Sequence, residues 1–99
     1  MRRIYVSLPI SGYYLEERKD YARLVEKYLV ENMPKPLIVI TPFTVCPEAD
    51  KPYSYYMGKD IEALLECDTV YFCKGWQDSK GCMAEFAVAR IYGKEILFE

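Results

Sequence analysis

Short apolar runs alternate along the chain with longer amphipathic segments. Four of these runs predict strands: Arg3–Leu8, Leu37–Ile40, Thr69–Cys73 and Glu95–Phe98. Between them, apolar residues recur at helical spacing in three segments: Leu15 to about Asn32, Tyr53–Glu66, and a segment that starts at Ser79 and ends at Gly93. This alternation predicts right-handed β-α-β units, a parallel sheet and helices on both of its faces.

The same pattern predicts which faces are buried. One face of the first helix collects large apolar side chains, namely Tyr21, Leu24, Val25, Tyr28 and Leu29. The charged side chains of that helix lie largely elsewhere, and they are Glu16, Arg18, Lys19, Arg23, Glu26 and Lys27. The run Leu37–Ile40 is apolar throughout, which is typical of a buried parallel strand. We expect a long loop, from Thr41 to about Pro52, to follow it.

Parallel sheets of this kind bind their ligands beyond the carboxyl ends of the strands. Three loops leave those ends, and they are Leu8–Gly12, Thr41–Pro52 and Lys74–Lys80. We therefore expect these loops to converge on one cleft.

Composition narrows the class of protein. The 99 residues, 52% of them hydrophobic, suit one packed domain over residues 1–99. A net charge of −2 gives no electrostatic support for nucleic acid or an anionic membrane as a partner. No apolar run approaches a membrane span, and the run after Arg3 is too short for the core of a signal peptide. We therefore expect a cytoplasmic protein.

The absence of histidine narrows the chemistry. It excludes a Cys/His zinc site, and the four cysteines lack the C-x-x-C spacing of a four-Cys site. We expect free, mostly buried thiols at Cys46, Cys67, Cys73 and Cys82. Ser-His and Cys-His mechanisms are also excluded, so acid–base chemistry falls to carboxylates, Tyr, Lys or Cys.

Glu85 is the leading candidate for chemistry. At about 100° per residue its neighbours on the helix are small or apolar, namely Gly81, Cys82, Val88, Ala89 and Tyr92. A charge on such a face is costly unless it is paired or used. We interpret Glu85 as a candidate nucleophile or base. A buried Glu that pairs with an Arg or Tyr, or that lies at a subunit contact, is an equal alternative.

Asp60 borders the apolar face of its helix and is a candidate second carboxylate, although a surface Asp paired with Lys59 fits the pattern slightly better. Two carboxylates in different environments suit glycosyl transfer, in which one attacks the anomeric carbon and the other handles protons. A salt-bridge network would use the same residues. Tyr5 lies mid-strand, where its hydroxyl either orients a carboxylate or is satisfied within the core.

Three further groups are candidates for binding. The turn after the first strand offers backbone N–H groups to a sugar or phosphate oxygen, and it consists of Ser7, Leu8, Pro9, Ile10, Ser11 and Gly12. Ser79 is an N-cap of the last helix, a phosphate ligand, or both. Four aromatic residues are candidates either for a wall against which a base stacks or for a dimer contact, and they are Trp76, Tyr53, Tyr55 and Tyr56.

Taken in order, these residues resemble the nucleoside 2-deoxyribosyltransferase superfamily, and most of all a branch of short bacterial proteins. The resemblance covers nearly the whole chain. It lies in Ile4-Tyr5-Val6-Ser7, Gly58-Lys59-Asp60-Ile61, Ser79-x-Gly81-x-x-x-Glu85 and Ala89-x-x-x-Gly93-Lys94. It implies an α/β three-layer sandwich with a small parallel sheet, flavodoxin-like or Rossmann-like.

The resemblance also implies roles at the matching positions. Glu85 attacks the anomeric carbon and holds a covalent glycosyl intermediate, Asp60 protonates or positions the leaving base, and Tyr5 orients Glu85. Ser79 lies where the related deoxynucleoside 5′-monophosphate N-glycosidases carry a phosphate-binding Ser, which shifts the expected substrate toward a 5′-monophosphate. Gly81 leaves room for a sugar beside the carboxylate. The resemblance implies no metal and no cofactor.

Two departures from the family pattern change the expectations. The sequence stops at Glu99, whereas family members often continue past the last strand and use that extension across a dimer contact. We expect a homodimer or higher homo-oligomer, in which the contribution of the partner comes from another segment, such as Tyr53–Met57. The loop Thr41–Pro52 has no counterpart that we can assign. The expected function is cleavage or transfer of the N-glycosidic bond of a (deoxy)nucleoside 5′-monophosphate or nucleoside. The alternatives are a non-catalytic nucleotide-binding module and an assembly protein.

Overall fold

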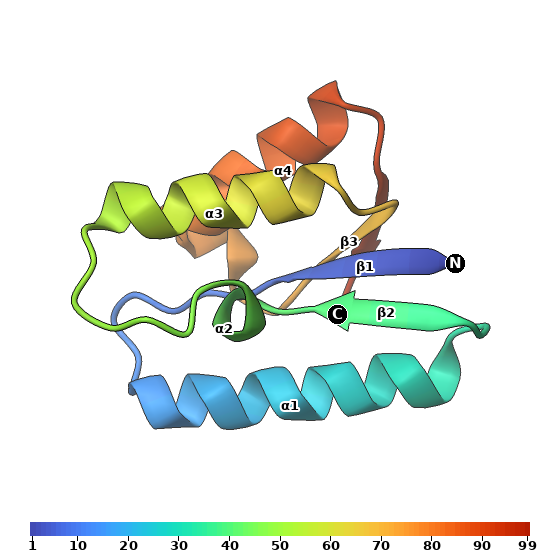
Figure 1. The fold of residues 1–99 in the computed structure, drawn as a ribbon, viewed down its shortest axis with the longest axis horizontal. Helices are drawn as coiled ribbons and strands as arrows, with labels where there is room; N and C mark the ends of the chain where they lie inside the picture. Colours follow the sequence, from blue (N-terminus) through green and yellow to red (C-terminus); the bar gives the residue numbers. More distant parts are fainter.

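Four parallel strands form the sheet in the computed structural model, which describes residues 1–99. In chain order they are β1 (Arg2–Ser7), β2 (Leu37–Ile40), β3 (Thr69–Phe72) and β4 (Glu95–Phe98). Their order in space is β2-β1-β3-β4 (Figure 1), so β1 and β3 are central and the other two are edge strands. The predicted parallel α/β sheet is confirmed.

Helices cover both faces of this sheet (Figure 1). The long helix α1 (Leu15–Asn32) packs on one face, and α3 (Tyr53–Leu65) and α4 (Lys80–Ile91) pack on the other. A short helix, α2 (Pro42–Val45), follows β2, and a 3-10 turn, η1 (Trp76–Asp78), precedes α4. Helix, sheet and helix form the three layers that the sequence predicts.

Side chains of β1 alternate between the two faces, as the pleat of a strand requires. Ile4 and Val6 pack in the cluster beneath α1. Tyr5 lies in the opposite cluster, beneath α3 and α4, and Ser7, two residues further, shares its face. All four side chains are fully buried. The central strand therefore presents two hydroxyl groups to the layer that contains Glu85.

The buried stripe of α1 differs from the predicted one. It consists of Arg18, Ala22, Val25 and Leu29. Leu24 and Tyr28, which we expected to face the core, are 67% and 55% exposed. A guanidinium can occupy the buried stripe because Glu17 pairs with it through two hydrogen bonds. The predicted apolar face is therefore wrong by about one residue position around the helix.

The segment around β2 also departs from expectation. β2 is half-buried rather than buried, because it lies at an edge of the sheet and pairs only with β1. The predicted loop after it begins with α2. Thr41 and Thr44 form a reciprocal capping box, in which each side chain accepts the backbone N–H of the other. Pro42 occupies the first helical position, where no N–H donor is needed.

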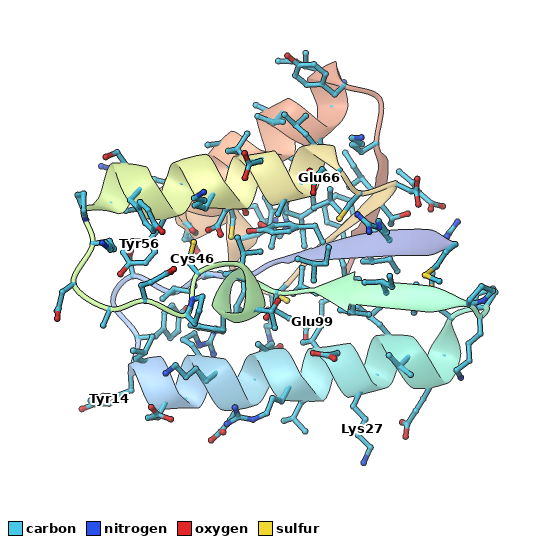
Figure 2. The ribbon with its side chains drawn as sticks, in the orientation of Figure 1. Tyr14, Lys27, Cys46, Tyr56, Glu66 and Glu99 are labelled. Atoms are coloured by element: carbon cyan, nitrogen blue, oxygen red, sulfur yellow. The ribbon has the colours of Figure 1, made fainter.

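Exposed side chains surround the three layers. Figure 2 shows Tyr14, which precedes α1, and Lys27 of α1 projecting away from the sheet, and Tyr56 pointing from α3 toward the segment that precedes it. All four cysteines are buried free thiols, which confirms their expected burial. None of the helices combines the length and the apolar character that crossing a membrane requires.

Candidate active site

Glu85 lies in the middle of α4 and is 4% exposed. Both of its carboxylate oxygens accept a hydrogen bond from β1. The Tyr5 hydroxyl donates to Oε2 at 2.9 Å, and the Ser7 hydroxyl donates to Oε1 at 2.7 Å. The carboxylate is thus held in one orientation by two buried donors. It has no cationic partner, which distinguishes it from a buried salt bridge.

The placement of Glu85 follows from local sequence on α4. Ser79 is the N-cap, and its side chain accepts a hydrogen bond of 3.2 Å from the backbone N–H of Cys82. From this start, the buried positions of the helix are Cys82, Glu85 and Ala89, spaced by three and four residues. Glu85 therefore faces the sheet at the point where Tyr5 and Ser7 of β1 reach the same layer.

Burial is the main influence on the acidity of Glu85. It raises the pKa of this carboxyl from 4.5 to about 7. The hydrogen bonds from Ser7 and Tyr5 act in the opposite direction, and the nearby charge of Asp60 raises the pKa further. The group is therefore divided between its two protonation states near neutral pH.

Asp60 is buried on α3, at 9% exposure. This contradicts the interpretation that favoured a surface Asp paired with Lys59, because Oδ1 of Asp60 has no hydrogen-bond partner. Burial raises the pKa of Asp60 to about 6. An unpartnered buried carboxyl oxygen is costly unless a ligand or proton satisfies it. Asp60 and Glu85 are thus two buried carboxyls on neighbouring helices, and the charge of Asp60 acts on Glu85.

Cys82, which the sequence indicated only as a neighbour of Glu85 and a buried thiol, adjoins these two carboxyls. Burial raises the pKa of its thiol, and the hydroxyls of Ser7 and Ser79 act in the opposite direction. The charges of Glu85 and Asp60 both act on it. The spacing of three residues between Cys82 and Glu85 was the signal for this contact. Ser7 was expected to bind substrate, and the structure instead gives its hydroxyl to Glu85.

The turn after β1 lies next to the loop after β3. Pro9 is buried and Ile10 half-buried, whereas Ser11 and Gly12 are exposed. A Cβ atom built on Gly75 would lie 3.8 Å from Cγ of Pro9 and 3.7 Å from the Tyr13 hydroxyl. Gly75 has a φ of +90°, a conformation that suits glycine. Two of the three expected loops therefore meet at the carboxyl ends of β1 and β3.

Trp76 does not stand free as a wall for a base. Its ring stacks on Phe86 at 4.7 Å and on Phe98 at 5.5 Å between ring centroids. The Tyr56 hydroxyl accepts the N–H of Lys51 and donates to the carbonyl of Glu48, so it supports the preceding loop. These contacts are consistent with packing roles in this conformation.

Two surface hollows lie away from the position expected for the single cleft. One, of about 460 Å³, lies between α2 and α3 and is lined by Ile40, Thr44, Val45, Glu48, Tyr55, Lys59, Glu62, Ala63 and Glu66. The other, of about 370 Å³, is lined by Phe72, Lys74, Gly75, Trp76, Gln77, Phe98 and Glu99. Neither includes Glu85 or Asp60.

The space beside Gly81 is also occupied. A Cβ atom at this position would lie 3.2 Å from the Tyr53 hydroxyl, 3.4 Å from Sδ of Met57 and 3.9 Å from Oγ of Ser79. The first turn of α4 therefore packs against the first turns of α3, where we expected room for a sugar. No group of three or more Cys, Asp or Glu side chains in residues 1–99 has the geometry to hold a metal ion.

Solved structures of 2-deoxyribosyltransferases share this fold. The enzyme from Leishmania mexicana aligns with a TM-score of 0.74 and 17% sequence identity, covering 99% of this chain. The enzyme from the psychrotolerant bacterium Bacillus psychrosaccharolyticus aligns with a TM-score of 0.70 and 19% identity, covering 97% of this chain. The chain spans 63% of the length of the first enzyme and 70% of the second. The expected resemblance in fold is confirmed.

Comparison with curated protein sequences gave no match. A profile of one protein family, described as "Domain of unknown function (DUF4406)", matches residues 2–98. Because this match extends over nearly the whole chain, the protein belongs to the DUF4406 family.

Proposed function

We propose that the protein cleaves or transfers the N-glycosidic bond of a (deoxy)nucleoside 5′-monophosphate or nucleoside, with Glu85 as nucleophile. The observation that carries this proposal is the carboxyl pair. Glu85 is oriented by the hydroxyls of Tyr5 and Ser7, and the buried Asp60 has an unpartnered oxygen close enough to influence it. The fold shared with 2-deoxyribosyltransferases supports the same reaction class.

The pair assigns a role to each group. Glu85, as a carboxylate, attacks C1′ of the sugar, and a C–O bond forms while the bond from C1′ to the base nitrogen breaks. The electron pair of the broken bond stays on that nitrogen, which takes its proton from the carboxyl of Asp60. Water, or the nitrogen of a second base, then attacks C1′ and releases Glu85, while Asp60 regains a proton from the attacking group.

The raised pKa values leave a minor fraction of molecules in the required state, because Glu85 must be ionised with a pKa of about 7 while Asp60 is protonated with a pKa of about 6. Burial raises the pKa of Asp60 to about 6, which keeps part of it protonated near neutral pH, as an acid requires. The Tyr5 hydroxyl fixes the orientation of Glu85, and burial, followed by the charge of Glu85, raises the pKa of Tyr5 well above its ordinary value. Tyr5 therefore stays a neutral donor throughout.

Substrate binding is assigned to the loops at the carboxyl ends of β1 and β3. Ser11 and Gly12 are exposed beside the buried Pro9 and half-buried Ile10, and Ser79 lies at the start of α4. We assign these groups to the 5′ end of the sugar. Trp76 and Gly81 require rearrangement to contact substrate, because their present neighbours are protein side chains.

The direct test is release of free base. The protein is incubated with the four 2′-deoxynucleoside 5′-monophosphates and the matching nucleosides, and products are separated by chromatography. We expect base release by the wild type and a loss of about a thousandfold in kcat for Glu85→Gln, which keeps the shape but not the charge. Rapid acid quench with intact mass measurement should show an added sugar on wild type only. Equal release by both proteins would exclude the proposed nucleophile.

A non-catalytic nucleotide-binding module is a second candidate. The 4% exposure of Glu85 favours it, because a nucleophile must be reached by its substrate. The two surface hollows described above also lie away from Glu85. Calorimetry with the same nucleotides distinguishes the two functions, since binding without turnover or covalent adduct supports the module. The expected homodimer or higher homo-oligomer stays a prediction, which sedimentation velocity measures.

A further inference from the structure

Arg18 is a buried arginine that the proposed chemistry does not use. It lies in the first turns of α1 and is 7% exposed. Its Nε and Nη2 atoms donate to the two carboxylate oxygens of Glu17, each at 2.7 Å. Its Nη1 atom donates to the backbone carbonyl of Pro9 at 3.3 Å. One side chain thus connects α1 to the turn that follows β1.

Two aromatic rings hold the guanidinium in place. Cζ of Arg18 lies 4.2 Å from the ring centroid of Tyr13 and 4.8 Å from that of Tyr21. A planar guanidinium suits such stacking, whereas an ammonium group does not reproduce it. Tyr13 comes from the end of the turn and Tyr21 from α1. The stack therefore joins the last residue of the turn to the helix that follows.

The same contacts reach the loop after β3. The ring of Pro9 and the hydroxyl of Tyr13 lie beside Gly75, at 3.8 and 3.7 Å from the position of a Cβ atom. Gly75 is the N-cap of η1, whose C-cap is Ser79. Arg18 thus supports, through Pro9 and Tyr13, both loops that we assign to the 5′ end of the substrate.

We propose that Arg18 is a positioning residue, which holds the Pro9–Gly12 turn in the conformation that receives the phosphomonoester of a nucleotide. This inference rests on the proposed function and deepens it, because it commits the substrate to the 5′-monophosphate class. Arg18 itself does not touch the substrate. Its effect is transmitted through the Pro9 carbonyl and the Tyr13 ring.

A purely structural role for Arg18 predicts that its replacement lowers the stability of the fold, whereas the positioning role predicts a stability close to that of the wild type. The side chain of Glu17 is half-exposed, so removing Arg18 leaves no buried charge without a partner, and methionine fills much of the same volume. Arg18→Met should therefore fold, and its unfolding midpoint in urea should stay close to that of the wild type. What it loses is the donor to Pro9 and the planar group between the two tyrosines. The turn, rather than the fold, is then the part that changes.

Kinetics with two substrates tests the proposal. We expect Arg18→Met to raise KM about tenfold for a 2′-deoxynucleoside 5′-monophosphate, with kcat within twofold of wild type and KM for the unphosphorylated nucleoside unchanged. Arg18→Lys should recover part of the loss. The matched control is Arg23→Met, on the same helix, where the arginine is exposed and pairs only with Asp20. A loss of equal size for both substrates, or a loss in kcat alone, would overturn the assignment.

A measurement without turnover separates this proposal from the proposed function. The amide N–H of Tyr13 donates to the carbonyl of Ile10 at 3.1 Å, and its hydrogen exchange reports on the turn. We expect Arg18→Met to speed this exchange at least tenfold while exchange in β1 and β3 is unchanged. If wild type releases no base, the exchange experiment and calorimetry with the monophosphate still decide the role of Arg18. Unchanged exchange overturns it.

A second variant covers the case in which Arg18→Met does not fold. Tyr13 is 51% exposed, so Tyr13→Leu removes one side of the stack without a buried cavity. We expect the same selective rise in KM for the monophosphate, by about threefold, with Arg18 still bonded to Glu17. No change for either substrate would overturn the role of the stack.

Discussion

The Ser7 hydroxyl donates a hydrogen bond of 2.7 Å to Oε1 of Glu85, across 78 residues of sequence. Both residues are buried, and the bond joins the carboxyl end of the central strand β1 to the middle of α4. A hydrogen bond to the charged form of a carboxyl group favours that form. Ser7 therefore acts against the burial that raises the pKa of Glu85, and it does so more than Tyr5 does.

Ser7→Ala should consequently raise the pKa of Glu85 above its value of about 7, and Tyr5→Phe should raise it by less. The physical reason is the loss of a charge-assisted donor, which contributes roughly 1.5–3 kcal/mol in favour of the ionised form. Titration of the Glu85 carboxyl by carbon NMR measures the shift directly and does not depend on activity. The opposite order of the two variants, or a fall in pKa, would contradict the assignment of the donors.

Protein stability should fall as pH rises from about 4.5 to about 7. The folded protein binds a proton at Glu85 up to a pKa of about 7, whereas the unfolded chain releases it near 4.5, so the folded state carries more protons in this window. The free energy of unfolding then decreases by at most about 3 kcal/mol and is flat above pH 7. Asp60 contributes in the same direction between about 4 and 6.

Urea unfolding at pH 5 and pH 8 measures this effect. Glu85→Gln should remove the larger part of the difference and should be the more stable protein at pH 8. Glu62→Gln on α3 is the matched control, because Glu62 is exposed. If the unfolding free energy of Glu85→Gln changed with pH as much as that of the wild type, a group other than Glu85 would cause the pH dependence.

The sequence predicted the elements well because their signals are local. The bounds of α1, β2 and β4 agree with the structure, since apolar runs and helix caps are read within a few residues. Glu85 was identified in the same way, from its small neighbours on one helix. What failed depends on side-chain contacts that hydrophobic periodicity does not describe. Arg18 is buried because Glu17 and the rings of Tyr13 and Tyr21 surround its guanidinium, whereas periodicity assigns a charged residue to the exposed face.

Packing between elements explains further differences at the candidate site. The parallel register places Phe72 beside Phe98, and Trp76 completes the aromatic cluster with them, so its ring is occupied by packing. Ser7 reaches Glu85 because its side chain lies on the face of β1 that α4 covers. Asp60 was expected at the surface because it borders the apolar face of its helix. The packing of α3 on β1 and α4 buries it instead.

A bell-shaped pH profile of kcat/KM should accompany base release. The proposed reaction needs Glu85 ionised and Asp60 protonated, yet their pKa values are about 7 and about 6. The maximum then lies between pH 6 and 7, where on the order of one molecule in twenty has both groups in the required state. Asp60→Asn removes the acid, so the fall at high pH should vanish and base release should drop about a hundredfold. If the profile of Asp60→Asn still falls above pH 7, Asp60 is excluded as the acid.

Gly81→Ala tests the contact between the first turns of α3 and α4. Alanine in a helix is favoured over glycine by roughly 1 kcal/mol, but its methyl group would lie 3.2 Å from the Tyr53 hydroxyl and 3.4 Å from Sδ of Met57. Tyr53 is 58% exposed, so its ring can swing outward. We expect an unfolding free energy between unchanged and about 1 kcal/mol higher, and the full gain when the same substitution is made in a Tyr53→Ala background.

Gly93→Ala is the contrasting substitution. Gly93 follows α4 with a φ of +67°, in the left-handed region that alanine avoids, and nothing lies within 4 Å of a Cβ atom there. Its replacement should lower the unfolding free energy by about 1 kcal/mol through backbone strain alone. Urea titration of the four variants and the wild type separates the two causes. If Gly81→Ala lost as much stability as Gly93→Ala, with and without Tyr53→Ala, the contact with Tyr53 would not be what limits the gain from alanine at position 81.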